Sequence, residues 1–383
     1  LGSMLGVLIE MSGGAESLAK TLTGVLGAKR TIAALTIVAF ILGTPVFFEV
    51  GFIIIIPLIY GFSKVAHVSP LKFGLPMAGV MLTVHVALPT HPGAAAAAGI
   101  LHSDVGWLML AGIGVSVVVG IVGYFVARFI NRRHYHLSIN VLEQQQTAEV
   151  PDLSVNAQQT RLPPPNALVI GGLIVVPIML IVSGTLCQAL LLPENAVRQL
   201  MTVIGTPPVA LLISLGLASW TLGIRRRMSL KKLGEVTGSA IPSSADVILV
   251  AGGGAFGGVL VASGIGNALA EALETIHLPL MPAAFLLSLV LRASQGSATV
   301  AILTTSGLLS QAVVGLEPLQ LVLVTLATCF GSLGLSHVND AGFWVVTRYL
   351  GLSVPDGLKT WTVLTTIMGV TGFLITWLLW FAL

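Results

Sequence analysis

Long apolar segments alternate with short polar ones along almost the whole chain. The apolar segments recur at about 20 residues, the length that a helix needs to cross the hydrocarbon core of a bilayer. One such segment could be a buried helix of a soluble domain, whereas a series of them indicates an all-α, polytopic membrane protein. The pattern predicts spans near residues 1–24, 71–102, 107–130, 166–186, 203–223, 246–273, 318–347 and 360–382.

Two further apolar stretches, residues 31–62 and 282–312, are too long for one helix and are interrupted near their middles. Gly43-Thr44-Pro45 interrupts the first, and a polar sequence around Gly296 interrupts the second. Glycine and proline at such points favour a turn over a continuous helix. We therefore expect two re-entrant hairpins, each entering and leaving the membrane on the same side.

The distribution of positive charge agrees with this arrangement. Residues 131–165 form a polar linker, and positively charged loops of membrane proteins face the cytoplasm. With the linker placed in the cytoplasm and both hairpins returning to their own side, all Lys and Arg except Arg198 and Arg292 fall on the cytoplasmic side. Reading either hairpin as two complete spans would invert everything that follows it. The charges therefore favour hairpins.

An internal repeat divides the chain into two halves. Gly6–Leu22 aligns with Gly257–Leu273, and in both halves a hairpin and then an interrupted span follow this segment. The two copies run in opposite directions in the predicted topology, which indicates the inverted repeats of many secondary transporters. We expect a first repeat over 1–130, the cytoplasmic linker 131–165 and a second repeat over 166–383. Two spans of the second half have no counterpart in the first, so we expect scaffold helices upstream of residue 1.

Composition supports a membrane protein and excludes several other classes. Of 383 residues, 55% are hydrophobic and only 9% are charged, against roughly a quarter charged in soluble domains. The densest basic cluster, around Arg225–Arg227, flanks a predicted span, so we expect no nucleic-acid partner. Cys187 and Cys329 both lie in apolar segments, where a disulfide is not expected. No motif indicates a cofactor.

The first hairpin carries Glu49 in the apolar sequence FFEVGF. A carboxylate at the centre of a bilayer costs about 2.5–3.5 kcal/mol on insertion scales, so its presence usually has a function. We interpret Glu49 as a proton-coupling residue, with a purely structural role in the hairpin as the alternative. Thr44 and Pro45 at the turn are assigned to the expected substrate site.

The span at 71–102 is interrupted by LPTHPG, Leu88–Gly93. Pro89 and Pro92 remove helical hydrogen bonds, so the helix must unwind there. The helix that restarts after Pro92 directs free amide groups into the gap, which favours an anionic ligand. We assign Thr90, His91 and Gly93 to substrate binding, although His91 is about equally compatible with a structural hydrogen bond. No Cys or carboxylate cluster accompanies the histidines, so no metal site is expected.

The second hairpin turns at RASQGSAT, Arg292–Thr299. Its polar groups and the glycine that permits the turn are assigned to substrate binding, namely Gln295, Gly296, Ser297 and Thr299. Arg292 offers a planar cation suited to a carboxylate. Direct contact with the substrate, an ion pair with Glu49 or Asp340, and extension to the membrane surface all remain open for Arg292.

The span at 318–347 contains SHVNDAG, Ser336–Gly342, in which four polar side chains lie within five residues. Such a cluster is costly against lipid and therefore indicates a functional site over a simple helix contact. We assign Ser336 and Asn339 to substrate binding and Asp340 and His337 to proton coupling.

At these four interruptions the sequence resembles the gluconate permease family of proton symporters, within the ion-transporter superfamily. The resemblance covers essentially the whole chain and is most specific at PVFFEVGF (45–52), LPTHPG (88–93), RASQGSATVA (292–301) and SHVNDAGFW (336–344). It implies an elevator-type carrier in the bacterial inner membrane, often a homodimer, that takes up gluconate or another sugar acid with protons. In one branch of the family the substrate is D-serine.

Other classes fit the sequence less well. An intramembrane protease would need paired catalytic motifs such as GxGD or GxSG, and the chain has neither arrangement. A channel would be favoured by rings of like charge or a filter sequence, whereas paired hairpins suit alternating access. A purely structural membrane protein would not need four polar interruptions. We therefore expect a transporter and no enzymatic activity.

Overall fold

Helices make up all the regular secondary structure in the part of the chain that the computed structural model describes. This part comprises residues 1–27, 30–138, 164–240 and 277–382, with Val141, Val259, Ser263, Glu271 and Thr275. Most of the linker 131–165, the span at 246–273 and the second repeat copy at 257–273 lie outside the described residues.

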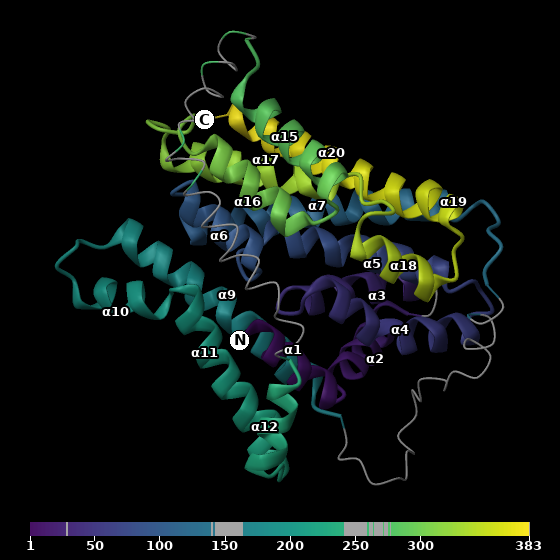
Figure 1. Cartoon of the computed structure of the whole chain (residues 1–383). Helices are drawn as coiled ribbons and strands as arrows, with labels where there is room; N and C mark the ends of the chain where they lie inside the picture. Colours follow the sequence, from purple (N-terminus) through teal and green to yellow (C-terminus); the bar gives the residue numbers. More distant parts are fainter. Residues whose placement is uncertain are drawn as a thin grey trace.

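The helices fall into three groups along the chain (Figure 1). The first group is α1 (Gly2–Met11), α2 (Gly14–Leu26), α3 (Thr31–Gly43), α4 (Phe48–Val65), α5 (Leu71–Ala87), α6 (Pro92–Ile100) and α7 (Val105–Ile130). The second is α9 (Ala167–Leu190), α10 (Ala196–Ile204), α11 (Pro207–Ala218) with a π-helical turn (Ser219–Gly223) and a 3₁₀ turn (Ile224–Arg226), and α12 (Leu230–Gly238). The third is α15 (Leu280–Gln295), α16 (Ala298–Leu309), α17 (Pro318–Leu333), α18 (Ala341–Leu350), α19 (Val354–Gly357), a π-helical turn (Leu358–Thr362) and α20 (Val363–Trp380).

The four interruptions expected from glycine, proline and polar residues are present. They separate α3 from α4, α5 from α6, α15 from α16 and α17 from α18, at residues 44–47, 88–91, 296–297 and 334–340. Pro92 and Pro318 occupy the first turn of their helices, where the missing N–H is no loss because it would have no intrahelical acceptor. The sequence therefore placed each interruption to within a few residues.

The expected continuous span at 1–24 is wrong. The structure divides it into α1 and α2, because Gly13 adopts a left-handed conformation with φ +79°. Glycine reaches this conformation without steric cost. The Ser12 hydroxyl donates to the Ile9 carbonyl oxygen (2.7 Å), a side-chain bond that accompanies the end of α1.

Six helical segments of the described residues are long and apolar enough to cross a membrane. They are Phe48–Val65, Leu71–Ile100, Val105–Ile130, Ala167–Leu190, Pro207–Arg226 and Val354–Trp380. Shorter apolar helices, among them α3, α15, α16 and α17, complete the bundle. Outward-facing leucine, valine and phenylalanine side chains on α7, α9 and α11 are exposed, as lipid-facing surfaces require.

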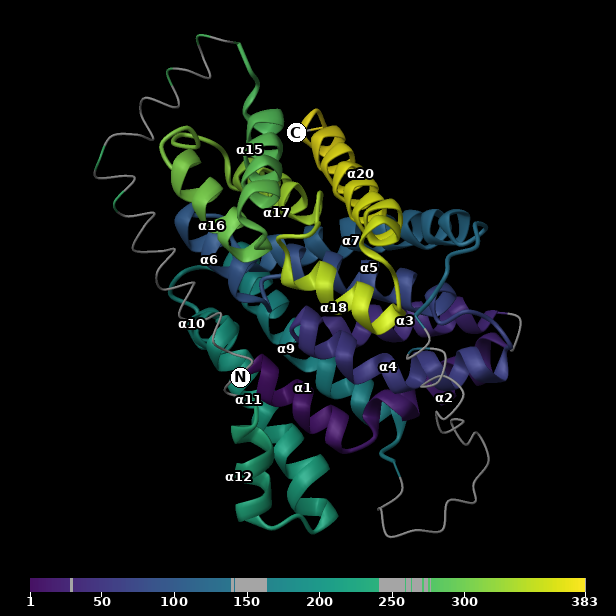
Figure 2. The same cartoon turned by 45° about the vertical axis from the view of Figure 1, so that its right-hand side comes forward.

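Two central helices, α5 and α17, contact each other and organise their surroundings in the same way. α5 packs against α3, α4 and α7, and α17 packs against α15, α16 and α20. Each group also reaches into the other, because α4 contacts α18 and α16 contacts α6 (Figure 2). The contacts thus occur in corresponding pairs, as two halves with a common fold would produce.

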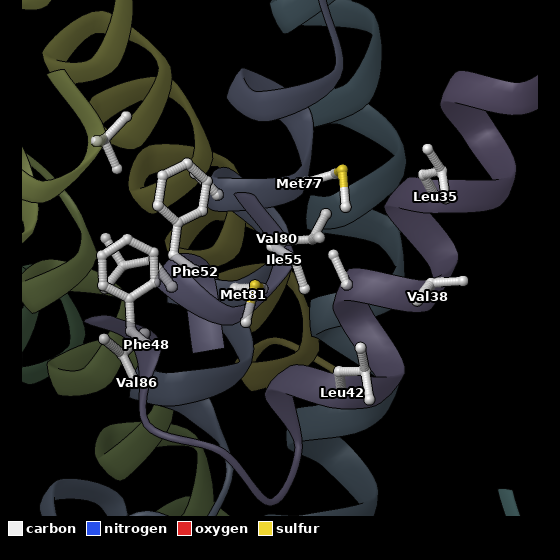
Figure 3. Close-up of a cluster of buried hydrophobic side chains, with 14 of the residues drawn as sticks. Leu35, Val38, Leu42, Phe48, Phe52, Ile55, Met77, Val80, Met81 and Val86 are labelled. Atoms are coloured by element: carbon white, nitrogen blue, oxygen red, sulfur yellow. The ribbon is translucent and has the colours of Figure 1, made fainter. Parts of the chain in front are cut away.

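An apolar cluster of buried side chains extends through much of the bundle and includes the contact among α3, α4 and α5. Figure 3 shows side chains of all three helices turned toward one another, with Leu42 from α3, Phe52 and Ile55 from α4, and Met81 from α5. All four are at least nine-tenths buried. This packing fixes the first hairpin against the helix that is interrupted at 88–91.

The helices α10, α11 and α12 lie at one side of the molecule (Figures 1 and 2), where α11 and α12 contact α1. α9 joins them to the bundle through contacts with α2, α3 and α7. α10 approaches α9 closely at Gly184 and Gly205, where an added Cβ would lie within 3 Å of the opposite backbone. The sequence did not predict α10 as a separate helix, since its nine residues are too short for a span.

Gly331→Ala should destabilise the protein by about 1–3 kcal/mol, the usual cost of overfilling a packed site. The new Cβ would lie 2.8 Å from the Ser288 Cβ and would also press on the Phe285 carbonyl, so α15 must move away from α17. Gly216→Ala is the matched control, because nothing lies within 4 Å of its new Cβ. In a helix interior that change should be neutral or favourable by up to about 1 kcal/mol. Thermal unfolding in detergent tests both, and equal midpoints for the two variants would contradict the packing.

Candidate functional site

The first hairpin turns at Thr44–Phe47, between α3 and α4. Thr44 and Pro45 are buried, and the Thr44 hydroxyl donates to the Phe40 carbonyl oxygen (3.3 Å) at the end of α3. Glu49 is half-buried in the first turn of α4, where a carboxylate is favourable because the helix N-terminus carries partial positive charge.

A histidine side chain connects the first interrupted helix to this hairpin through a hydrogen bond. His91 is buried, and its Nε2 lies 2.9 Å from the carbonyl oxygen of Gly43, the last residue of α3. The His85 ring lies 4.6 Å from the His91 ring, and the Phe47 ring lies 5.9 Å from it. The structural hydrogen bond considered for His91 is therefore present.

The second hairpin turns at Gly296–Ser297, between α15 and α16. Gly296 has φ +76°, and an added Cβ would collide with the carbonyl group of Asn339. Only glycine meets both conditions without strain. Ser297 is the N-cap of α16 and accepts from the Val300 amide (3.4 Å), while Gln295 is exposed at the turn.

The second interrupted helix is fastened to the second hairpin in a corresponding way. The carbonyl oxygen of Ala293, near the end of α15, lies 2.9 Å from His337 Nε2 and accepts from Asn339 Nδ2 at 2.7 Å. In both halves, then, a histidine of the interrupted helix contacts a carbonyl at the end of the first hairpin helix.

A buried ion pair adds to this connection. The Arg292 Nη2 lies 2.5 Å from the Asp340 Oδ2, and the two side chains are 2% and 5% exposed. Arg292 also donates from Nη1 to the Gly296 carbonyl oxygen (3.0 Å), whereas its Nε has no hydrogen-bond partner. Of the roles left open for Arg292, the structure shows the ion pair with Asp340, and the guanidinium is buried in the protein interior.

The two halves also contact each other at their interruptions. An added Cβ on Gly93, in the first turn of α6, would lie 3.3–3.7 Å from Ile302 and Thr299 of α16. An added Cβ on Gly342, in the first turn of α18, would lie 2.9 Å from the Phe48 ring of α4. Each restarted helix thus meets the second helix of the opposite hairpin. Together with the histidine contacts, these contacts connect all four interruptions in a closed ring.

Three residues that follow α19 also contact the site, although the sequence analysis did not assign them to it. Trp361 donates from its indole nitrogen to the Ser336 hydroxyl oxygen (2.7 Å), and the Ser336 hydroxyl in turn donates to Asp340 Oδ2. Thr362 donates to the Ser336 carbonyl oxygen (2.6 Å), and Thr366 accepts from the Leu335 amide (3.1 Å).

The Trp361 ring also stacks on Phe48, with ring centroids 5.7 Å apart. Trp361 and Thr362 lie in a π-helical turn, a feature that often marks functional sites but is invisible in an apolar sequence.

The remaining predicted site residues differ in their surroundings. Thr299 is buried at the contact with Gly93, and Thr90 is half-buried with a hydroxyl oxygen that has no hydrogen-bond partner. Asn339 is exposed beside the second hairpin. The described residues contain no group of three or more His, Cys, Asp or Glu side chains that could hold a metal ion.

A bundle of membrane-crossing helices whose polar, unwound segments meet in the interior defines the class of polytopic membrane transport proteins. Comparison with known proteins gives the family. The GntP family permease profile matches residues 1–382. The chain therefore belongs to the GntP permease family, and its members are transporters, not enzymes.

Several relatives cover nearly the whole chain. The inner membrane permease YgbN of Escherichia coli (strain K12) is 61% identical over 381 residues, which cover 99% of this chain and 84% of the relative. The gluconate permease of Bacillus subtilis (strain 168) is 36% identical over 382 residues, 97% of this chain and 83% of the relative. Among solved structures, the Alcanivorax borkumensis YdaH transporter matches with a TM-score of 0.55 and 14% identity, over 96% of this chain and 83% of that chain. This last likeness supports the transporter fold alone.

Removing one partner of the buried ion pair should be more harmful than removing both. Arg292→Gln and Asp340→Asn should each lower the free energy of unfolding by about 3–5 kcal/mol, because each leaves an unpaired charge in the interior. The double variant leaves no net charge and should be more stable than at least one single variant. Thermal unfolding of the purified proteins measures all three. Additive losses in the double variant would show that the two side chains do not depend on each other.

Proposed function

We propose that this protein is a secondary active transporter that takes up gluconate or a related sugar acid together with protons across the bacterial inner membrane. Family membership supports transport, and the relatives include proteins named gluconate permeases and an L-idonate transporter. The name of the Escherichia coli relative supports the inner membrane. All of these named substrates are small hydroxylated carboxylates.

The observation that carries the proposal is the closed ring of four interruptions. Unwound backbone inside a membrane is tolerated where protein buries it or where it lines a cavity. Here each interruption contacts two others, so a small ligand at their meeting point could touch both halves at once. The residues proposed to bind the substrate are Thr44, Pro45, Thr90, His91, Gly93, Arg292, Gln295, Gly296, Ser297, Thr299, Ser336 and Asn339.

The proposed architecture is a pair of inverted repeats, residues 1–130 and 166–383, joined by the cytoplasmic linker 131–165. The corresponding helix contacts around α5 and α17 support two related halves. In this proposal α3–α4 and α15–α16 are re-entrant hairpins that move with the interrupted helices as one transport unit. The helices α9–α12 belong to the scaffold, through which the protein forms a homodimer.

Proton coupling is proposed for Glu49, His337 and Asp340. Glu49 stands apart from the other two because it lies on the first hairpin, whereas Asp340 is engaged by Arg292 and Ser336. Protonating Asp340 would weaken the connection between hairpin and interrupted helix, and protonating Glu49 would leave that connection intact.

The substrate and its coupling are tested by uptake into proteoliposomes. Radiolabelled gluconate should accumulate inside the proteoliposomes when their lumen is more alkaline than the outside solution, and a proton uncoupler should abolish the accumulation. An excess of unlabelled L-idonate should compete, because it shares the hydroxylated carboxylate. Competition by D-serine but by none of the sugar acids would instead assign the protein to the amino-acid branch. Accumulation that needs sodium and ignores the uncoupler would contradict proton coupling.

Glu49→Gln should lose accumulation driven by a pH gradient while retaining exchange of labelled for unlabelled gluconate. The reason is that exchange needs binding and movement, whereas accumulation also needs the release of protons. Glu194→Gln is the control, since Glu194 is exposed in the loop between α9 and α10. Accumulation by Glu49→Gln that still follows the pH gradient would remove Glu49 from the coupling mechanism.

A further inference from the structure

Four helices begin at the interruptions, and three of them carry their own group to satisfy the helix N-terminus. α4 has Glu49 in its first turn. α16 has the Ser297 side chain, which accepts from the Val300 amide. α18 has Asp340, whose Oδ1 accepts from the Gly342 amide at 3.1 Å. Such groups offset the partial positive charge and the free amides of a helix start.

The fourth helix, α6, differs from these three. Among the four helix starts at the described interruptions, it alone has neither a side-chain cap nor an acidic residue in its first turn. Its first intrahelical bond runs from the Ala95 amide to the His91 carbonyl oxygen (3.1 Å). Pro92 has no amide hydrogen, so the amides of Gly93 and Ala94 are left without an intrahelical acceptor. Both residues are buried, where an unsatisfied amide is rare and costly.

Side-chain atoms at the same place also have no partner. The His85 Nδ1 and the Thr90 hydroxyl oxygen are buried and without a hydrogen bond. His85 is only 7% exposed, and its ring lies 4.6 Å from that of His91, the N-cap residue of α6. A buried polar atom without a partner calls for a ligand, a water molecule or an ion that satisfies it.

The corresponding position in the second half shows what such a helix start accepts. There Asp340 places a carboxylate on the N-terminus of α18, and Arg292 neutralises it. α6 has the same type of start and the same contact with the opposite hairpin, but its N-cap is His91. Among the described helix starts, α18 thus has an acidic N-cap, whereas α6 has neither a side-chain cap nor an acidic residue in its first turn.

We propose that the carboxylate of the substrate binds at the N-terminus of α6, in the position that corresponds to Asp340 in the second half. It accepts hydrogen bonds from the amides of Gly93 and Ala94 and from the Thr90 hydroxyl, with the His85 ring beside it. This assignment rests on the proposed uptake of an organic acid and narrows it to one helix start. The assignment leaves Arg292 paired with Asp340, so Arg292 contacts a part of the substrate other than its carboxylate.

The packing around the start of α6 also indicates which elements must separate before a ligand can enter. The start of α16 covers this site through the contact of Thr299 with Gly93. Admitting a carboxylate therefore requires the second hairpin to separate from α6, while the ion pair between Arg292 and Asp340 holds that hairpin to its own interrupted helix. The site opens between the two halves and not within one of them.

The test supplies α6 with a carboxylate of its own. His91→Asp should imitate Asp340 and exclude the substrate, whereas His91→Asn has nearly the same shape without the charge. We expect His91→Asp to bind radiolabelled gluconate about 10- to 100-fold more weakly than His91→Asn, the range expected for hydrogen bonds to a charged group. Asp and Asn both cap a helix, but only the Asp charge offsets the partial positive charge at the start of α6, so His91→Asp should unfold at a higher temperature than His91→Asn without ligand.

Two further variants complete the experiment. Thr206→Asp places the same new charge on another helix that begins with proline, α11, where Thr206 is exposed, and it should bind gluconate as the unmodified protein does. Thr90→Val should weaken gluconate binding about tenfold through the loss of one charged hydrogen bond. If His91→Asp and His91→Asn bind gluconate equally and Thr90→Val binds normally, the inference is overturned while the proposed function stands. If the unmodified protein binds no sugar acid, the proposed function itself fails.

Discussion

Unwound backbone in an apolar interior must be satisfied by the protein itself, and this constraint organises the structure. Each of the four interruptions exposes carbonyl and amide groups that lipid cannot hydrogen-bond. The protein satisfies many of them with side chains from a neighbouring interruption, as His91 does for Gly43 and as His337 and Asn339 do for Ala293. The interruptions consequently depend on one another, and they gather at one place instead of being distributed along the bundle.

The two halves use this constraint unequally. The second half is connected internally by a chain of hydrogen bonds from Trp361 through Ser336 and Asp340 to Arg292. The first half is connected by a histidine contact, between His91 Nε2 and the Gly43 carbonyl oxygen. The second hairpin is thus held to its interrupted helix by a buried ion pair as well as by a histidine contact. Trp361 links the two halves, because its ring also stacks on Phe48 of the first hairpin.

Much of the fold could be predicted from the sequence, because its signals are local. Pro89 and Pro92 cannot take part in a continuous helix, and a polar cluster such as Ser336–Asp340 cannot face lipid. These features placed the four interruptions and most spans. The division of the first span at Gly13 was missed, since a single glycine in an apolar segment is also compatible with a helix. The short helix α10 was missed because its nine residues are too short to give the sequence signal of a membrane span.

The site was predictable only in part, because its contacts join distant residues. The sequence offered three roles for Arg292 and could not choose among them, since the choice depends on Asp340 lying beside it in space. Trp361 gave no sequence signal at all, because a tryptophan in an apolar span is ordinary. The sequence also could not show that α6 lacks a side-chain cap, because capping depends on which side chain lies beside which amide in the folded chain.

The most direct test of this account is a cryo-EM structure of the protein in nanodiscs with bound gluconate. We predict density for the carboxylate at the amides of Gly93 and Ala94, with the ion pair between Arg292 and Asp340 intact and Thr299 moved away from Gly93. Density for the carboxylate on Arg292, with Asp340 released from it, would contradict the account.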